Sequence, residues 1–186
     1  MSMQAPKSCD TWVGVTHARL PVAAAFDWAV LPRCGAVVLF SGTARDHTAG
    51  RDVPAPVEQL EYETYDGRVE PRLAEVADEA RRRWPVLGRV ALLHRLGAVA
   101  VGESSVVVVV SAPHRPEAFA GGRFCIDTIK ATVPIWKREV WAGGHAWAAD
   151  AHDLVDAAPA DVSAVDVTAV DVAPVEHPRA PANVLE

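Results

Sequence analysis

The spacing of apolar residues changes several times between the period of a strand and the period of a helix over the first 150 residues. Alternating residues, or apolar runs of strand length, predict strands at Asp10–Ala18, Gly35–Ser41, Leu60–Thr64, Arg89–Leu96 and Ser104–Ser111. Apolar residues three or four apart predict two long helices, Val69–Trp84 and Pro113–Val133, each followed by a proline that ends it. A short helix is expected to begin at Pro21, and the chain to close with a hairpin over Val140–Ala149.

The five-valine run Val106–Val110 is the most apolar strand, and such a strand must be covered on both faces. The segment Gly97–Glu103 is interpreted as the connection that leads into it. Two main helices packed on a mostly antiparallel sheet place the predicted fold in the α+β class.

Residues 153–186 differ from the rest of the chain in composition. They are acidic and rich in alanine, valine and proline, and they contain the imperfect repeat DVSAV, DVTAV, DVAPV. Few large side chains are available to offset the entropy of ordering, so we expect a disordered tail. The alternating valines leave one other possibility, an added edge strand. The predicted organisation is a folded domain over residues 1–152 and a low-complexity tail over residues 153–186.

Charge and cysteine content narrow the class of protein. From residue 151 onward seven acids oppose one base, so residues 1–150 balance at 17 acids and 17 bases. A neutral domain gives little support for binding nucleic acid.

No apolar run reaches the roughly 18–20 residues of a membrane span, and the N-terminus lacks the pattern of a secretory signal. Three widely spaced cysteines without a CxxC pair argue against a disulfide framework or a zinc site, and they fit the cytoplasm.

The scarcity of lysine draws attention to one segment. The chain has fifteen arginines but only three lysines, and two of these, Lys130 and Lys137, lie in the apolar segment KATVPIWK. An ammonium group can lose its proton when desolvated, whereas a guanidinium cannot, so paired lysines favour a catalytic site. The alternative is a solvated helix face, because Arg123, Asp127 and Lys130 form a charged stripe at helical spacing.

Two further segments could bind an anion. His114 and Arg115 lie where a buried strand leads into a helix, and free N–H groups at such a junction commonly bind phosphate. The alternative is a capping residue followed by a surface charge. The polar loop 41–52 carries Arg45, His47 and Arg51, which could order around a charged ligand or form an ordinary loop. The motifs of P-loop, dinucleotide-binding, zinc-protease and serine-hydrolase proteins are absent from the sequence.

Five segments taken in order resemble the large, catalytic subunit of molybdopterin synthase. They are GAVVLFSGTARDH, LEYETY, ARRRWPVLGRVALLHRLG, SAPHRPEAF and IKATVPIWKRE. The resemblance runs from about Cys34 to Trp147, and PHR followed by KxxxPxWKxE is its most specific part.

The resemblance implies an α/β-hammerhead fold and a sulfurtransferase. The large subunit would form a homodimer, and each end would bind a small ubiquitin-like sulfur-carrier subunit, giving a heterotetramer. The C-terminal Gly-Gly thiocarboxylate of the carrier would supply sulfur to cyclic pyranopterin monophosphate (precursor Z). Two transfers would form the dithiolene of molybdopterin in molybdenum cofactor biosynthesis. Neither a metal nor another cofactor is implied at this step.

The resemblance also implies roles for individual residues. Lys130 matches the essential lysine beside the carrier terminus, and Lys137 matches the second lysine of the pocket. Arg45, His114 and Arg115 match the positions that hold the pterin and its phosphate, with the backbone of Thr43 and Ala44 nearby. Arg138 and Glu139 match positions that complete the wall of the pocket.

The main alternative to a sulfurtransferase is a non-catalytic paralogue, which would bind the carrier without converting substrate. A generic anion-binding module is a third possibility. The proline-rich segment Arg51–Val57 and the tail depart from the family pattern, so the resemblance assigns them no role.

Overall fold

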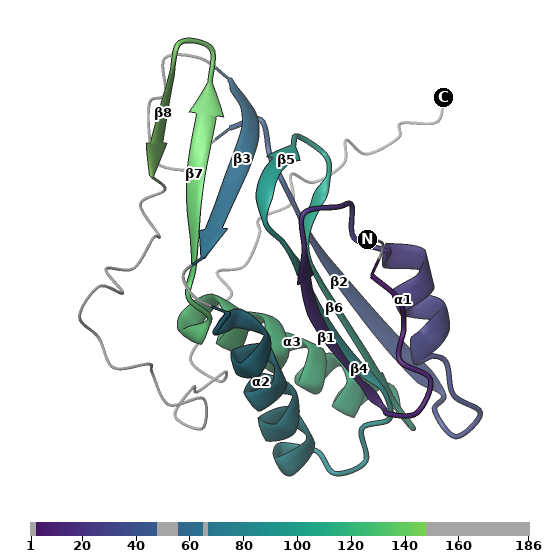
Figure 1. Cartoon of the computed structure of the whole chain (residues 1–186). Helices are drawn as coiled ribbons and strands as arrows, with labels where there is room; N and C mark the ends of the chain where they lie inside the picture. Colours follow the sequence, from purple (N-terminus) through teal and green to yellow (C-terminus); the bar gives the residue numbers. More distant parts are fainter. Residues whose placement is uncertain (1–2, 48–55, 65–66, 148–186) are drawn as a thin grey trace, which may run out of the picture.

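The computed structural model describes residues 3–47, 56–64 and 67–147, which form three helices and two four-stranded sheets. The helices are α1 (Val22–Ala29), α2 (Val69–Arg83) and α3 (Arg115–Thr132). The strands are β1 (Thr11–Thr16), β2 (Ala36–Thr43), β3 (Val57–Thr64), β4 (Val90–Arg95), β5 (Gly97–Ala100), β6 (Ser104–Ala112), β7 (Ile135–Trp141) and β8 (Gly144–Trp147). Figure 1 shows the second sheet projecting from a body made by the first sheet and the helices.

The first sheet has the strand order β1-β4-β6-β2. β1 runs parallel to β4, and the other two pairings are antiparallel. The valine run Val106–Val110 lies in β6, and all five residues are buried. Val106, Val108 and Val110 face the core under α2 and α3, whereas Val107 and Val109 face the core beside α1. The expectation that this strand is covered on both faces is therefore confirmed (Figure 1).

The second sheet has the order β5-β3-β7-β8 and is antiparallel throughout. β7 begins directly after α3, because Val133 has already left the helical conformation and Pro134 cannot continue the helix. β7 and β8 form a hairpin whose turn contains Gly143 at a φ of 85°, a conformation that favours glycine.

The α+β class and the two long helices predicted from the pattern are confirmed. Three details of the prediction are wrong. The strands form two sheets and not one, and Gly97–Ala100, interpreted as a connection, is strand β5. A four-residue strand is too short to show a period, and the positive φ of Gly97 turns the chain out of β4 and into the other sheet. β7 also begins five residues before the predicted hairpin.

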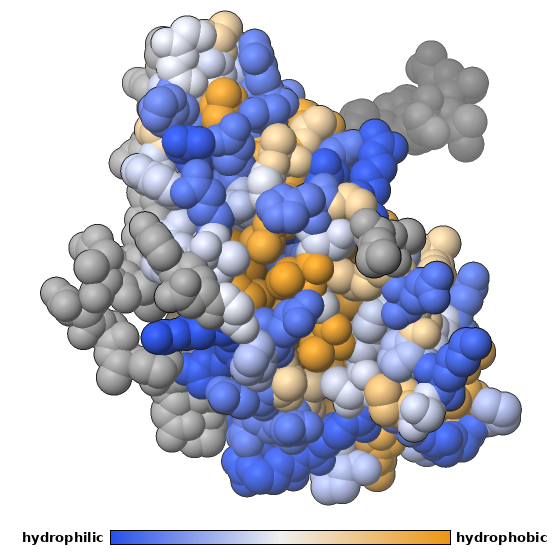
Figure 2. Space-filling model, in the orientation of Figure 1, coloured by the Kyte–Doolittle hydropathy of each residue, from blue (hydrophilic) through white to orange (hydrophobic). Residues whose placement is uncertain are grey.

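The surface in Figure 2 is mostly hydrophilic over the helices, with apolar residues gathered between the second sheet and the body. In the part of the chain that the structure describes, no helix has the length and apolar character needed to cross a membrane. The proposed boundary at residue 152 and the tail after it lie outside the described residues, as does most of the segment Arg51–Val57.

Candidate functional site

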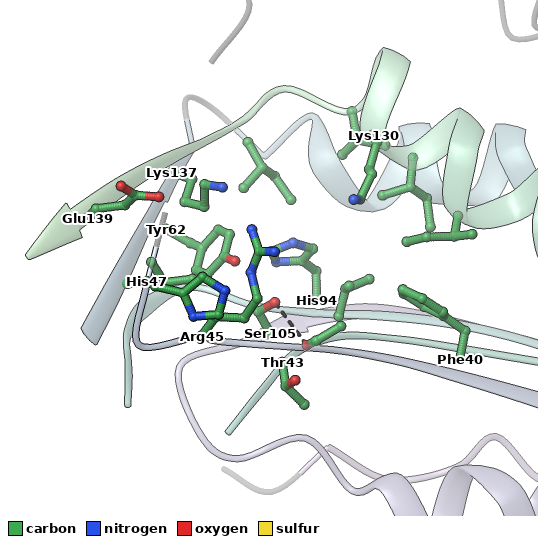
Figure 3. Close-up of a pocket in the computed structure, with 17 residues that line it drawn as sticks. Phe40, Thr43, Arg45, His47, Tyr62, His94, Ser105, Lys130, Lys137 and Glu139 are labelled. Atoms are coloured by element: carbon green, nitrogen blue, oxygen red, sulfur yellow. Dashed lines mark hydrogen bonds between the residues drawn. The ribbon is translucent and has the colours of Figure 1, made fainter. Parts of the chain in front are cut away.

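A cavity of about 520 Å³ lies where the two sheets and the end of α3 meet. Its floor comes from β4 and β6, one wall from α3, and the opposite wall from β3 and β7. Strand β2 and the residues that follow it close a further side. The side chains that bear polar groups are labelled in Figure 3.

The two rare lysines reach this cavity from different elements. Lys130 lies in the last turn of α3, and Lys137 lies on β7 opposite Tyr62 of β3. Side chains alternate along a strand, so Lys137 and Glu139 both face the cavity while the residue between them faces away. Figure 3 shows the two amines pointing into the same space.

The charged stripe considered as an alternative for Lys130 lies on α3, with Arg123 and Lys130 both exposed. Arg123 and Asp127 form an ion pair with each other, one turn apart on α3. Lys130 instead lines the cavity. Lys130 therefore borders the cavity and also remains exposed to water, as the alternative of a solvated helix face expects.

The end of β2 supplies Thr43 and Arg45 to the cavity lining. The pairing of β2 with β6 shifts register between Gly42 and Thr43, which re-aims the chain at this point. Ala44 is buried, and its backbone N–H donates to the carbonyl of Glu103 at 3.0 Å. That N–H is already used within the fold, and Ala44 packs in a core cluster with Val57, Leu60 and Val99 and does not line the cavity.

The charges around the cavity favour an anion. Arg45, Lys130 and Lys137 line it, whereas Glu139 is the one acidic side chain among its described lining residues. His47 at the mouth forms a 2.7 Å hydrogen bond with Asp46, and this hydrogen bond lowers the pKa of the Asp46 carboxyl. Fixed positive donors in a partly enclosed site stabilise bound or developing negative charge.

Comparisons with known proteins identify the family of the chain that forms this cavity. Residues 15–132 match the family model described as MoaE protein. The chain belongs to the MoaE family. It is 38% identical over 143 residues to the molybdopterin synthase catalytic subunit of Taeniopygia guttata, covering 77% of this chain and 88% of that protein. It is 46% identical over 113 residues to the catalytic subunit of Escherichia coli, covering 61% and 72%.

The fold of this MoaE family member also matches a solved structure. The crystal structure of molybdopterin synthase from Staphylococcus aureus has a TM-score of 0.66 and 33% identity, and the match covers 72% of this chain and 94% of that chain. The resemblance found in the sequence motifs is thus confirmed by a family model, by related sequences and by the fold.

Besides Ala44, three residues proposed for the site lie outside the cavity of the single chain. His114 and Arg115 begin α3, whereas Lys130 lies near its end. Fifteen residues of helix separate Arg115 from Lys130, which is about 22 Å along the axis. His114 and Arg115 are exposed, and the His114 side chain makes no capping hydrogen bond. Arg138 faces the opposite side of β7, where it pairs with Glu61.

Sequence reasoning missed three polar residues that line the cavity, namely Tyr62, His94 and Ser105. Tyr62 and Ser105 look like ordinary strand residues, so the sequence offers no signal for them. His94 does carry a signal, because it interrupts the otherwise apolar run VALL of β4 with a titratable side chain. Burial lowers the pKa of His94 to about 4.

Proposed function

We propose that this protein is the catalytic subunit of a molybdopterin synthase. It transfers sulfur from the thiocarboxylated C-terminus of a small ubiquitin-like carrier to cyclic pyranopterin monophosphate. The observation that carries this proposal is the convergence of Lys130 and Lys137 on one cavity in a chain that belongs to the MoaE family. The relatives named as catalytic subunits support the same activity.

Lys130 is proposed to act on the reacting groups. Its amine lies at the cavity rim in the single chain, where water reaches it. A carrier terminus threaded into the cavity would exclude that water, which strengthens the interaction of the ammonium with the thiocarboxylate. The same group can then move protons while the carrier's sulfur attacks the substrate and while water cleaves the resulting thioester, which leaves the sulfur on the substrate and a carboxylate on the carrier.

The other cationic groups are proposed to bind the substrate. Lys137 lies deeper on β7 and is half-buried, and Arg45 reaches in from the end of β2. Together they offer donors to the phosphate and to the oxyanion that forms during transfer. The backbone of Thr43 lies next to Arg45 in the chain, and Glu139 bounds the wall next to Lys137.

A second copy of the chain is proposed to complete the site with His114 and Arg115. β2 is an edge strand of the first sheet, and the first half of α3 packs against it, because Gly122 leaves room for Val38. The exposed fraction of Phe119 on α3 is 64% and that of Phe40 on β2 is 36%. Exposed aromatic residues at an unpaired edge are typical of an interface.

Two-fold symmetry across this interface would bring the two ends of α3 from different copies together. If two α3 helices lie antiparallel across a two-fold axis, the start of one helix meets the end of the other. Arg115 of one copy then approaches Lys130 of the second copy. The separation of about 22 Å within one chain would thus be removed by the homodimer. Each end of the dimer would bind one carrier, which makes a heterotetramer.

A cytoplasmic location is also proposed. Cys9, Cys34 and Cys125 are all free thiols, which fits a reducing compartment.

Reconstitution tests the proposed function directly. The purified protein is mixed with thiocarboxylated carrier and precursor Z, and the pterin product is identified by mass. Formation of molybdopterin at a rate that depends on the protein is the expected result. A protein that binds the carrier but leaves the precursor unchanged would be a non-catalytic paralogue, and the proposal would be wrong.

A further inference from the structure

His94 is a buried histidine on the floor of the cavity. It lies on the central strand β4, and only 6% of its surface is exposed. Its ring meets the ring of Tyr62 edge-on, with 5.1 Å between centroids and 73° between planes. Figure 3 shows the imidazole behind the Arg45 side chain, between the two lysines. The ring is therefore held in one orientation and still borders the cavity.

One hydrogen bond fixes the tautomer of this imidazole. Nδ1 lies 2.7 Å from the backbone carbonyl oxygen of Arg95. A carbonyl oxygen only accepts, so Nδ1 must carry the hydrogen and donate it. In a neutral ring Nε2 is then an acceptor with an unshared electron pair. Among the described residues, no side chain or backbone group makes a hydrogen bond to Nε2 of His94.

Burial keeps the ring neutral, because the pKa of His94 is lowered to about 4. The hydrogen bond to the backbone of Arg95 acts against burial but does not offset it, and several charged groups line the cavity around the ring. Arg45 beyond β2, Lys130 on α3 and Lys137 on β7 are the cationic side chains among the described lining residues. Glu139 on β7 is the acidic one, and both it and Lys137 take part in other interactions. A neutral acceptor therefore stands among cationic donors.

We propose that His94 is a substrate-binding residue whose Nε2 atom accepts a hydrogen bond from an N–H group of the substrate's heterocyclic ring. This inference rests on the proposed function, because the pterin ring supplies the N–H donors. The cations of the cavity bind the phosphate and other anionic groups, which offer only acceptors. A neutral, fixed acceptor recognises the opposite pattern, so His94 would distinguish a pterin from a simple anion.

The steady-state kinetics of matched variants test the role. His94→Phe keeps an aromatic ring against Tyr62 and removes the acceptor, whereas His94→Gln places an amide oxygen near the position of Nε2. His145→Phe is the control, because His145 is exposed on β8 and does not line the cavity. Removing the partner of a buried donor is expected to raise the KM for precursor Z about tenfold in His94→Phe. His94→Gln should stay within roughly threefold of the wild type, and the control should be unchanged.

The outcomes separate binding from folding. An unchanged KM in His94→Phe would overturn the proposal. So would an equal fall of kcat in both His94 variants at constant KM with lowered thermal midpoints, because that pattern indicates a structural role. A raised KM in His94→Phe at unchanged kcat, with recovery in His94→Gln, supports it.

Failure of the proposed function is recognised separately, by a wild-type protein that does not convert precursor Z. The proposal for His94 is then decided on the wild-type protein by the imidazole ¹⁵N chemical shifts. A Nε2 resonance of the unprotonated type that moves on titration with precursor Z, but not with inorganic phosphate, supports it. A protonated Nε2 at neutral pH, or no response to precursor Z, overturns it.

Discussion

Lys130 and Lys137 point into one cavity although a helix end and a proline separate them along the chain. α3 delivers the first amine from its last turn, and β7 delivers the second from a strand that starts only two residues after Val133. The abrupt change from helix to strand at Pro134 is what brings both amines to the same space. The segment KATVPIWK thus works as a corner of the fold, with one lysine on each side.

Loss of the Lys130 amine is expected to abolish sulfur transfer. Lys130→Ala should lower kcat at least about 100-fold, because a group that moves protons in the transition state contributes on this scale. Binding of the carrier, measured by calorimetry, should persist. Lys7→Ala is the matched control, since Lys7 is exposed near the N-terminus and lies outside the cavity. Turnover near that of the wild type in Lys130→Ala would remove Lys130 from the mechanism.

Complementation between variants tests whether the site is shared by two copies. Lys130→Ala and Arg115→Ala should each be inactive as homodimers. Co-expression should restore about a quarter of wild-type activity, because half of random dimers are mixed and each holds one complete site. Product formation by the co-purified mixture is the measurement. Equal inactivity of the mixture and the separate variants would show that Arg115 serves the site of its own chain or no site.

The buried imidazole of His94 predicts a pH dependence of stability. Its pKa is about 4 in the folded protein, below the value of 6.5 that it takes when unfolded. The unfolded chain therefore binds the proton first, and stability is full above pH 6.5 and falls as the pH drops toward 4. The loss from this group amounts to roughly 3 kcal/mol. The free energy of unfolding, measured by urea titration at several pH values between 7 and 4.5, should fall less steeply with decreasing pH in His94→Phe than in the wild type.

The three thiols are expected to differ in reactivity. Cys125 is fully buried on α3, and burial raises its pKa to about 12, so the reactive thiolate is scarce. Cys9 is exposed. A thiol reagent should label Cys9 in the native protein and reach Cys125 only after unfolding, as read by peptide mass. Rapid labelling of Cys125 under native conditions would contradict the packing of α3 on the first sheet.

Much of the architecture could be predicted from local pattern. Val69–Arg83 and Arg115–Thr132 have apolar residues at helical spacing over four or five turns, so their type was clear and their ends were fixed by proline. Strand β5 and the division into two sheets could not be predicted. Which strands pair depends on contacts between distant residues, and Gly97–Ala100 pairs with β3 and not with its neighbour in sequence.

The sequence by itself determined the α+β class, because this depends on residue type and local spacing. It also determined the family, through motifs that follow one another in order, and it singled out the lysine pair as a candidate site. The tertiary structure alone decided which groups share a cavity. It placed Lys130, Lys137 and Arg45 around one cavity, with His94 on the floor. Arg138 points to the other side of the second sheet, where it pairs with Glu61 of β3. The reason is geometric: alternation along a strand and the length of a helix fix where a side chain points, but only packing fixes what stands opposite it.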